Sequence, residues 1–174
     1  MRIRDKNKLA HEKAVVDELL DRIKIKPSDS RPGNPDQREP DIIYRIEEKT
    51  VGVEVVCAYY TEDEAKATAE AAAEKPLAAD EVRPGKVIGS PDDSICDAIK
   101  ECLDEKCKKA YSGTDETWLC IHADATITES VTIEECAKNL NVPNHGFARI
   151  FVAMTKSENE GGSLAVFEIP PTQK

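Results

Sequence analysis

The chain has 174 residues, 33% of them charged, and its formal net charge at pH 7 is −10. This length suits one compact domain with a sizeable core. The acidic balance argues against a protein that binds nucleic acid through a uniformly basic surface, because affinity for phosphate comes from lysine and arginine. No run of about 18 apolar residues is present, so we expect no transmembrane helix. The first residues lack the apolar stretch of a secretory signal.

The six cysteines indicate a reducing compartment. No two of them have C-x-x-C spacing, and most lie in apolar runs or predicted helices, as small buried residues do. A chain of this length does not need a framework of disulfides to stabilise its core. We therefore expect free thiols and a cytoplasmic location.

The first third of the sequence predicts a helix, a loop and two strands. Residues 6–25 place leucine, valine and isoleucine at helical spacing. Residues 26–40 contain four prolines and a glycine, which predicts a mobile loop that faces a substrate. Residues 41–47 and 51–59 are rich in β-branched residues and are separated by a short polar turn. Together they predict a hairpin.

The middle of the sequence predicts two helices and a buried strand. Residues 62–74 are rich in alanine and predict a helix with an acidic face. Residues 76–93 are punctuated by proline and glycine and predict a connection, with a short strand at 86–89. A second helix is expected to begin at residues 92–94 and to continue through Tyr111. Residues 117–123 then form a nearly continuous apolar run, which is typical of a central strand covered on both faces.

The last part of the sequence predicts a short helix at residues 132–140 and strands at 147–154 and 163–169. We find no internal repeat and no sign of a second domain. The order of elements therefore predicts a single α/β domain over residues 1–174, with a mixed central sheet flanked by helices.

The hairpin places two carboxylates where they could act together. Asp41 begins the first strand, and Glu54 lies among valines within the second. Gly52 and Glu54 share one face of that strand, and a glycine lets another group approach closely. Two carboxylates and a backbone carbonyl form a hard oxygen site that suits Mg²⁺. The alternative is that Asp41 is a turn residue and Glu54 an exposed residue on a half-buried strand.

Each of the two long helices carries one charged residue within its apolar stripe. Glu12 falls in the stripe of the first helix, between Leu9 and Val16. Lys106 falls near the centre of the stripe of the later helix. Taken singly, Glu12 could point to solvent at the edge of the stripe, and Lys106 could extend its amine to water. Together with the two strand carboxylates, they indicate a convergent site.

These residues resemble the PD-(D/E)XK nuclease superfamily, which has the restriction-endonuclease-like fold. The PD pair that ends in Asp41 matches the first part of that motif. The sequence EVV that begins at Glu54 matches (D/E)-x-K, with Val56 in place of the lysine. The core of the family is a helix, a hairpin that carries both parts of the motif, a helix and a further strand. The resemblance covers residues 9–125 and implies a restriction-endonuclease-like core.

The resemblance implies a metal-dependent nuclease. Asp41, Glu54 and the backbone carbonyl of Val55 would hold Mg²⁺, with Mn²⁺ as an alternative. Several branches of the family bring a glutamate of the first helix to the metal, and Glu12 matches it. Two other PD pairs occur in this chain, but neither leads straight into a predicted strand.

Val56 is the main departure from the family. The family lysine orients the attacking water and stabilises charge on the phosphate, and some branches supply it from the following helix. Lys106 is the candidate for that role here. The implied function is hydrolysis of DNA phosphodiester bonds. We expect the protein to contact the DNA backbone through the 26–40 loop and through these basic residues: Arg2, Arg4, Lys6, Lys8 and Lys108.

Two other functions are compatible with the sequence. A catalytically inactive nuclease-like domain that binds a protein partner would account for Val56 and for the charge of −10; a homodimer is also left open. A small-molecule enzyme could use His11, His122 or His145. We expect no metal cluster from these residues, because no histidine and cysteine have the spacing of metal ligands.

Overall fold

Helices and strands follow the hydrophobic pattern over most of the chain. The computed structural model describes residues 3–59, 91–123, 128–143, 145–155 and 163–170, with backbone alone for residues 3–6 and 91. The helices of this part are α1 (Ile3–Arg22), α3 (Pro91–Cys107) and α4 (Ser130–Asn139). The strands are β1 (Asp29–Pro32), β2 (Ile42–Ile46), β3 (Lys49–Ala58), β4 (Glu116–Ala123), β5 (Arg149–Thr155) and β6 (Leu164–Glu168).

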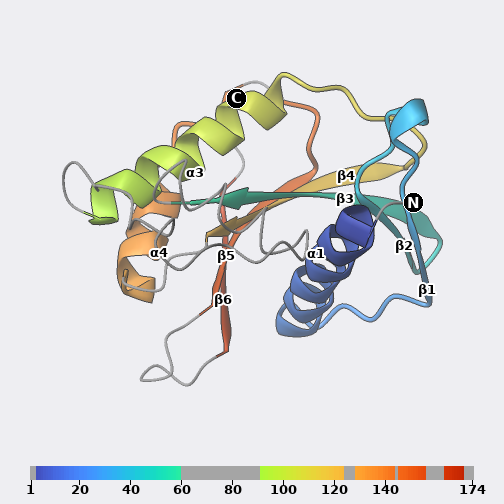
Figure 1. Cartoon of the computed structure of the whole chain (residues 1–174), viewed down its shortest axis with the longest axis horizontal. Coiled ribbons are helices and arrows are strands. Elements are labelled where there is room, and N and C mark those ends of the chain that lie inside the picture. Colours follow the sequence, from blue (N-terminus) through green and yellow to red (C-terminus); the bar gives the residue numbers. More distant parts are fainter. Residues whose placement is uncertain (1–2, 60–90, 124–127, 144, 156–162, 171–174) are drawn as a thin grey trace.

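The six strands form one mixed sheet whose spatial order is the order of the chain, from β1 to β6. β1, β2 and β3 are antiparallel neighbours, β3, β4 and β5 are parallel, and β6 is antiparallel to β5. Figure 1 shows the twist of the sheet, because β3 runs across the view whereas β6 runs from top to bottom. The prediction of a single α/β domain with a mixed sheet flanked by helices is confirmed.

Helices cover both faces of the sheet, and each face has its own apolar core (Figure 1). On the first face, Val16 and Leu19 of α1 pack on side chains of β2 to β6, including these: Val53, Val55, Trp118 and Phe151. On the second face, Ile99 and Leu103 of α3 and Ile133 of α4 pack on the alternate side chains of β3 to β6, including these: Leu119, Ile121 and Val152. Because side chains alternate along a strand, Glu54 faces the α3 side and Cys57 faces the α1 side.

The segment 26–40 is more regular than the loop that the sequence predicted. It contains β1, which pairs with β2, and a 3-10 turn at Pro35–Gln37. Arg31 binds the carboxylate of Glu39 through both terminal guanidinium nitrogens, at 2.8 Å each, and so ties the two ends of the segment together. Prolines are tolerated in an edge strand because its outer N–H groups have no ladder partner, which is why their number misled the prediction.

The ends of two helices also differ from the prediction. α1 lies at Ile3–Arg22 instead of 6–25, and the chain leaves it through Lys24, which has a positive φ of 59°. α3 ends at Cys107 and does not reach Tyr111, because the next residues bond to the 26–40 segment. The helix predicted at 62–74 and the strand predicted at 86–89 lie outside the described residues.

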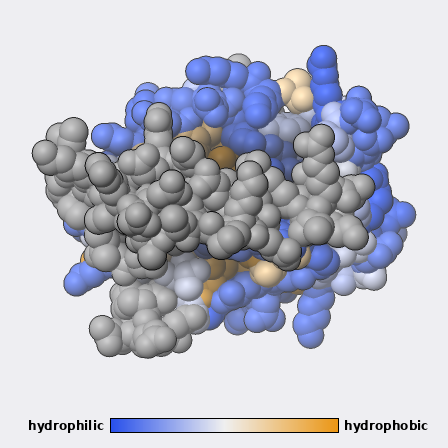
Figure 2. All heavy atoms as spheres, viewed as in Figure 1, coloured by the Kyte–Doolittle hydropathy of each residue, from blue (hydrophilic) through white to orange (hydrophobic). Residues whose placement is uncertain are grey.

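The remaining predicted elements are confirmed to within two residues at each end. No helix in the described part of the chain is long and apolar enough to cross a lipid bilayer. On the face drawn in Figure 2, hydrophilic residues make up most of the described surface. Val131, near the start of α4, is the one large hydrophobic side chain that is strongly exposed among the described residues.

Candidate functional site

The site lies where β2 separates from β3. The last residue pair of the hairpin at this end is Ile42 with Val53. Asp41 then leaves the ladder, and its Oδ2 accepts a hydrogen bond from the backbone N–H of Val55 at 2.9 Å. The N–H and C=O of one residue point to the same side of an extended strand, so the Val55 carbonyl also faces this gap. The gap therefore collects the oxygen donors that the sequence predicted.

Glu54 and Lys106 form a short ion pair at this gap. Lys106 Nζ lies 2.5 Å from Glu54 Oε1. Glu54 is only 7% exposed, and the side chain of Lys106, in the last turn of α3, is 13% exposed. The predicted approach of Lys106 to Glu54 is confirmed. The alternatives, an exposed Glu54 and a lysine that extends to solvent, are wrong.

The carboxylates are close enough to perturb one another. The pKa of Asp41 is raised to about 6, first because burial disfavours the charged form and then because Glu54 and Glu12 are negative. The hydrogen bond from Val55 opposes this rise. A carboxyl group with a raised pKa beside two other acids is a place where a cation is stabilised.

Glu12 joins this acid cluster from α1. It is 5% exposed, and its carboxylate lies 3.1 Å from the amine of Lys8 one turn earlier. Burial is the main cause of its raised pKa; the positive charge of Lys8 opposes the rise, and the negative charge of Glu54 adds to it. Glu12 therefore does not point to solvent, and the structure places its charge beside those of Asp41 and Glu54.

A cavity of about 410 Å³ opens over the two strand carboxylates. Tyr111 lines it, and its hydroxyl is buried close to Glu54. Burial, followed by the negative charge of Glu54, raises the pKa of Tyr111. The sequence analysis missed Tyr111 because it expected the helix to continue. Instead Ser112 donates to the backbone oxygens of Gln37 and Arg38, and these bonds hold the chain after α3 against the cavity.

The basic residues at the cavity differ from those predicted to bind DNA. Arg38 and Lys109 line it, whereas the exposed Lys108 does not. Lys8, which was also predicted to bind DNA, is paired with Glu12 one turn later in α1. Arg4 and Lys6 lie in α1 with side chains outside the description, and Arg2 lies outside the described residues.

Gly52 and Val56 fulfil structural roles on the same face as Glu54. A Cβ atom at Gly52 would lie 2.5 Å from the ring of Pro40 and 2.8 Å from the methyl group of Thr114. Glycine therefore lets Pro40 pack closely and fixes the start of the segment that carries Asp41. Val56 packs against the core on the α3 side. Lys109 is the one lysine among the described residues that line the cavity.

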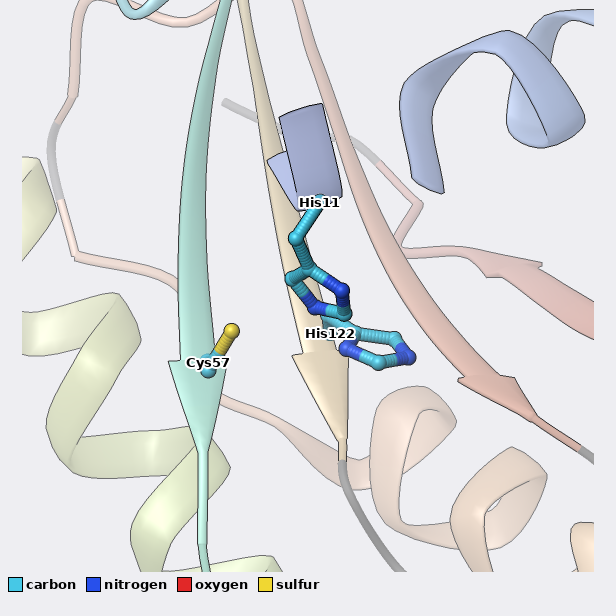
Figure 3. Close-up of side chains that lie close together, drawn as sticks. All are labelled: His11, Cys57 and His122. Atoms are coloured by element: carbon cyan, nitrogen blue, oxygen red, sulfur yellow. The ribbon is translucent and has the colours of Figure 1, made fainter. Parts of the chain in front are cut away.

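A second cluster lies on the opposite face of β3. His11, Cys57 and His122 bring three donor atoms within 4.8 Å of one another (Figure 3). The sequence analysis expected no metal cluster because it relied on spacing along the chain, whereas these three residues, which lie far apart in the sequence, form a group that could hold a metal ion. His145 lies elsewhere, where its Nδ1 accepts a hydrogen bond from the N–H of Phe147 at 3.1 Å.

Comparisons of the chain with protein-family models, with curated proteins and with solved structures find no match. The chemistry of the site is therefore argued from its own atoms. Two carboxylates and a carbonyl at the edge of a sheet, with a lysine at 2.5 Å from one of them, can hold a hard divalent cation and a phosphate together.

Proposed function

We propose that this chain is a metal-dependent phosphodiesterase that hydrolyses DNA and has a restriction-endonuclease-like core. The element order supports this assignment: α1, the β2–β3 hairpin, α3 and β4 follow the order of helix, hairpin, helix and strand in the PD-(D/E)XK family. β4 pairs in parallel with the second strand of the hairpin. The positions of Asp41 and Glu54 on that hairpin agree with the two parts of the family motif.

One observation carries the proposal. Lys106 reaches Glu54 from a different element and lies 2.5 Å from it, although Val56 occupies the motif position. A lysine amine that is largely removed from water costs several kcal/mol unless a negative group compensates it. The fold therefore holds an ammonium next to the carboxylates, where the family chemistry needs one.

The donor set fits the metal that the family implies. Asp41, Glu54 and the Val55 carbonyl offer only oxygen atoms, which Mg²⁺ and Mn²⁺ prefer over nitrogen and sulfur. The raised pKa of Asp41 indicates that its negative charge is not fully compensated by the protein. A bound divalent ion would lower the pKa of a water molecule and shield the negative charge of the scissile phosphate.

The surrounding side chains have complementary tasks. Lys106 would stabilise the charge that develops on the phosphate oxygens, as preorganised donors do. Tyr111 lines the cavity, and its hydroxyl can donate to a phosphate oxygen. Arg38 and Lys109 at the cavity would hold the DNA backbone through charge, without reading its sequence.

Cleavage of labelled single- and double-stranded DNA with Mg²⁺ or Mn²⁺ tests the proposal. Asp41→Asn and Glu54→Gln should each lower the rate by roughly 100-fold or more, since each removes a charge that holds the ion. The control is Asp36→Asn, because Asp36 belongs to another PD pair and does not line the cavity. Cleavage that survives Asp41→Asn, or that the Asp36 control loses equally, contradicts the assignment.

The second candidate is an inactive nuclease-like domain that binds a basic protein partner. Val56 packs in the core, and Lys106 already has Glu54 as its partner, so the pair could be purely structural. The net charge of −10 also suits a basic partner better than DNA. Wild-type protein that binds no Mg²⁺ and cleaves no DNA at low salt would favour this candidate.

A further inference from the structure

The second cluster lies at the carboxyl ends of parallel strands. Cys57 and His122 are the second-last residues of β3 and β4, and the parallel register places them side by side. Both side chains lie on the α1 side, since Val55 and Cys120, two residues before each of them, belong to the core on that side. In α/β sheets, ligands bind preferentially at the carboxyl ends of parallel strands.

α1 brings the third residue over this edge. His11 lies one turn before Val15, which packs against the sheet, so the histidine continues the sheet-facing stripe towards the open end. The rings of His11 and His122 have centroids 5.4 Å apart and are inclined at 59°. Figure 3 shows the Cys57 sulfur and both imidazole rings converging from the two strands and the helix. His11 is exposed and His122 is buried, so the cluster is open to solvent on one side.

The neighbour of His122 orients its ring. Thr155 Oγ1, at the end of β5, lies 3.4 Å from His122 Nε2. If the hydroxyl accepts a hydrogen bond from Nε2–H, the proton stays on Nε2 and the lone pair of Nδ1 is available to a metal. Partners of metal-bound histidines act in the same way. In Figure 3 one ring nitrogen of His122 faces the other two residues, and the second nitrogen points away from them.

The distances suit an ion that draws the three ligands together. Zn–N and Zn–S bonds of about 2.1 and 2.3 Å in a tetrahedral site put the ligand atoms roughly 3.5 Å apart. In the structure the three atoms lie within 4.8 Å of one another. His11 and Cys57 are the less buried of the three side chains, so the adjustment to bonding distance would fall mainly on them.

We propose that His11, Cys57 and His122 form a Zn²⁺ site, separate from the acid site on the other face of β3. Two imidazoles and a thiolate are borderline and soft donors, which select Zn²⁺ over Mg²⁺. Three protein ligands leave the fourth position to water or to a substrate atom, an arrangement that catalytic zinc sites use. Binding releases the proton of the Cys57 thiol to solvent, so the affinity for the ion rises with pH.

Titration with Co²⁺ tests this site, because Co²⁺ takes the place of Zn²⁺ and a thiolate bound to it gives a charge-transfer band in the near ultraviolet. The reduced full-length chain, freed of metal by a chelator, should develop this band to a plateau at one Co²⁺ per chain. Stoichiometric Zn²⁺ should abolish the band, whereas excess Mg²⁺ should leave it unchanged. Absence of the band at one equivalent of Co²⁺ overturns the proposal.

Two variants locate the site. Cys57→Ser should eliminate the band, and His11→Ala should weaken Co²⁺ binding by roughly 10- to 100-fold, since one of three ligands is lost. The exposed position of His11 makes its substitution compatible with folding, which circular dichroism of each variant verifies. Cys96→Ser is the matched control, because this half-buried thiol lies on α3. A band that persists in Cys57→Ser, or that Cys96→Ser loses, assigns the ion to other cysteines and refutes the site.

Discussion

The two faces of β3 carry two clusters that handle charge in opposite ways. On the α3 face, Glu54 is buried and needs Lys106 at 2.5 Å to compensate it. On the α1 face, Cys57 and His122 present a sulfur atom and imidazole nitrogens, and the two residues lie side by side in the parallel register. Because side chains alternate along a strand, one strand can present hard donors on one face and soft donors on the other. The difference shows that the kind of donor atom presented depends on the face of the strand, and not on the strand as a whole.

The largest effect is expected from removing the lysine of the acid site. Lys106→Ala should lower DNA cleavage by roughly 100-fold or more, because it removes a preorganised positive charge at the phosphate. Lys108→Ala is the matched control: Lys108 is exposed two residues later and does not line the cavity, so the rate should change by less than about threefold. Initial rates and thermal unfolding of both variants are the measurements. Equal rates for the two variants would remove Lys106 from the chemistry, and the Co²⁺ band of the opposite face should be unaffected in either case.

The next largest effect is expected on the pH dependence of stability, through Asp41 at the acid site. The pKa of Asp41 is about 6 in the folded chain and 3.8 in its ordinary state, so folding keeps this group protonated to a higher pH. The free energy of unfolding must then fall as the pH rises from about 4 to 6. Asp41→Asn lacks this loss and should be more stable than the wild type above pH 6, by at most about 3 kcal/mol, with no gain near pH 4.

Urea unfolding between pH 4 and 7, in the presence of a chelator, measures this difference. Asp21→Asn, an exposed substitution on α1, is the control. Addition of Mg²⁺ at pH 7 should make the wild type the more stable of the two proteins. The ion stabilises the wild type, whereas the variant lacks one of the ligands that would hold it. A wild type that is the more stable protein at pH 7 without metal would contradict the charge accumulation at the acid site.

The smallest effect concerns the packing that positions Asp41. A methyl group at Gly52 would meet the ring of Pro40 and the methyl group of Thr114 at less than 3 Å, and neither neighbour can rotate away freely. Gly52→Ala should therefore destabilise the chain by about 1 to 2 kcal/mol. Gly146→Ala is the control, since nothing lies within 4 Å of its Cβ position. Thermal unfolding gives the comparison, and equal stabilities would show that Pro40 does not depend on this glycine.

The acid site could be predicted because its parts are local or periodic. Asp41 and Glu54 lie in one hairpin, whose short turn nearly fixes the pairing. Lys106 was found because it interrupts an apolar stripe at helical spacing. Tyr111 was missed because α3 ends at Cys107, and Ser112, after the helix, bonds to a segment more than 70 residues earlier, a contact that the local sequence does not encode.

The second cluster and the first strand could not be predicted for related reasons. His11, Cys57 and His122 meet only when the parallel register of β3 and β4 is known and α1 is placed above it. Parallel register depends on a long crossover and leaves no turn in the sequence to mark it. β1 was missed because prolines usually indicate a loop, although an edge strand accepts them.

The order of the sheet has a consequence for how the protein folds. β1, β2 and β3 pair with their sequence neighbours, so this part can form from local contacts and should form early. The pairing of β3 with β4 joins segments such as Thr50 and Asp115 that are 65 residues apart, and the loop closure makes it slow. Asp41 and Glu54 are thus assembled by a fast step, whereas Lys106 arrives only with the slow one. Until Lys106 arrives, we expect water and dissolved cations, instead of the protein's own lysine, to stabilise the acid pair.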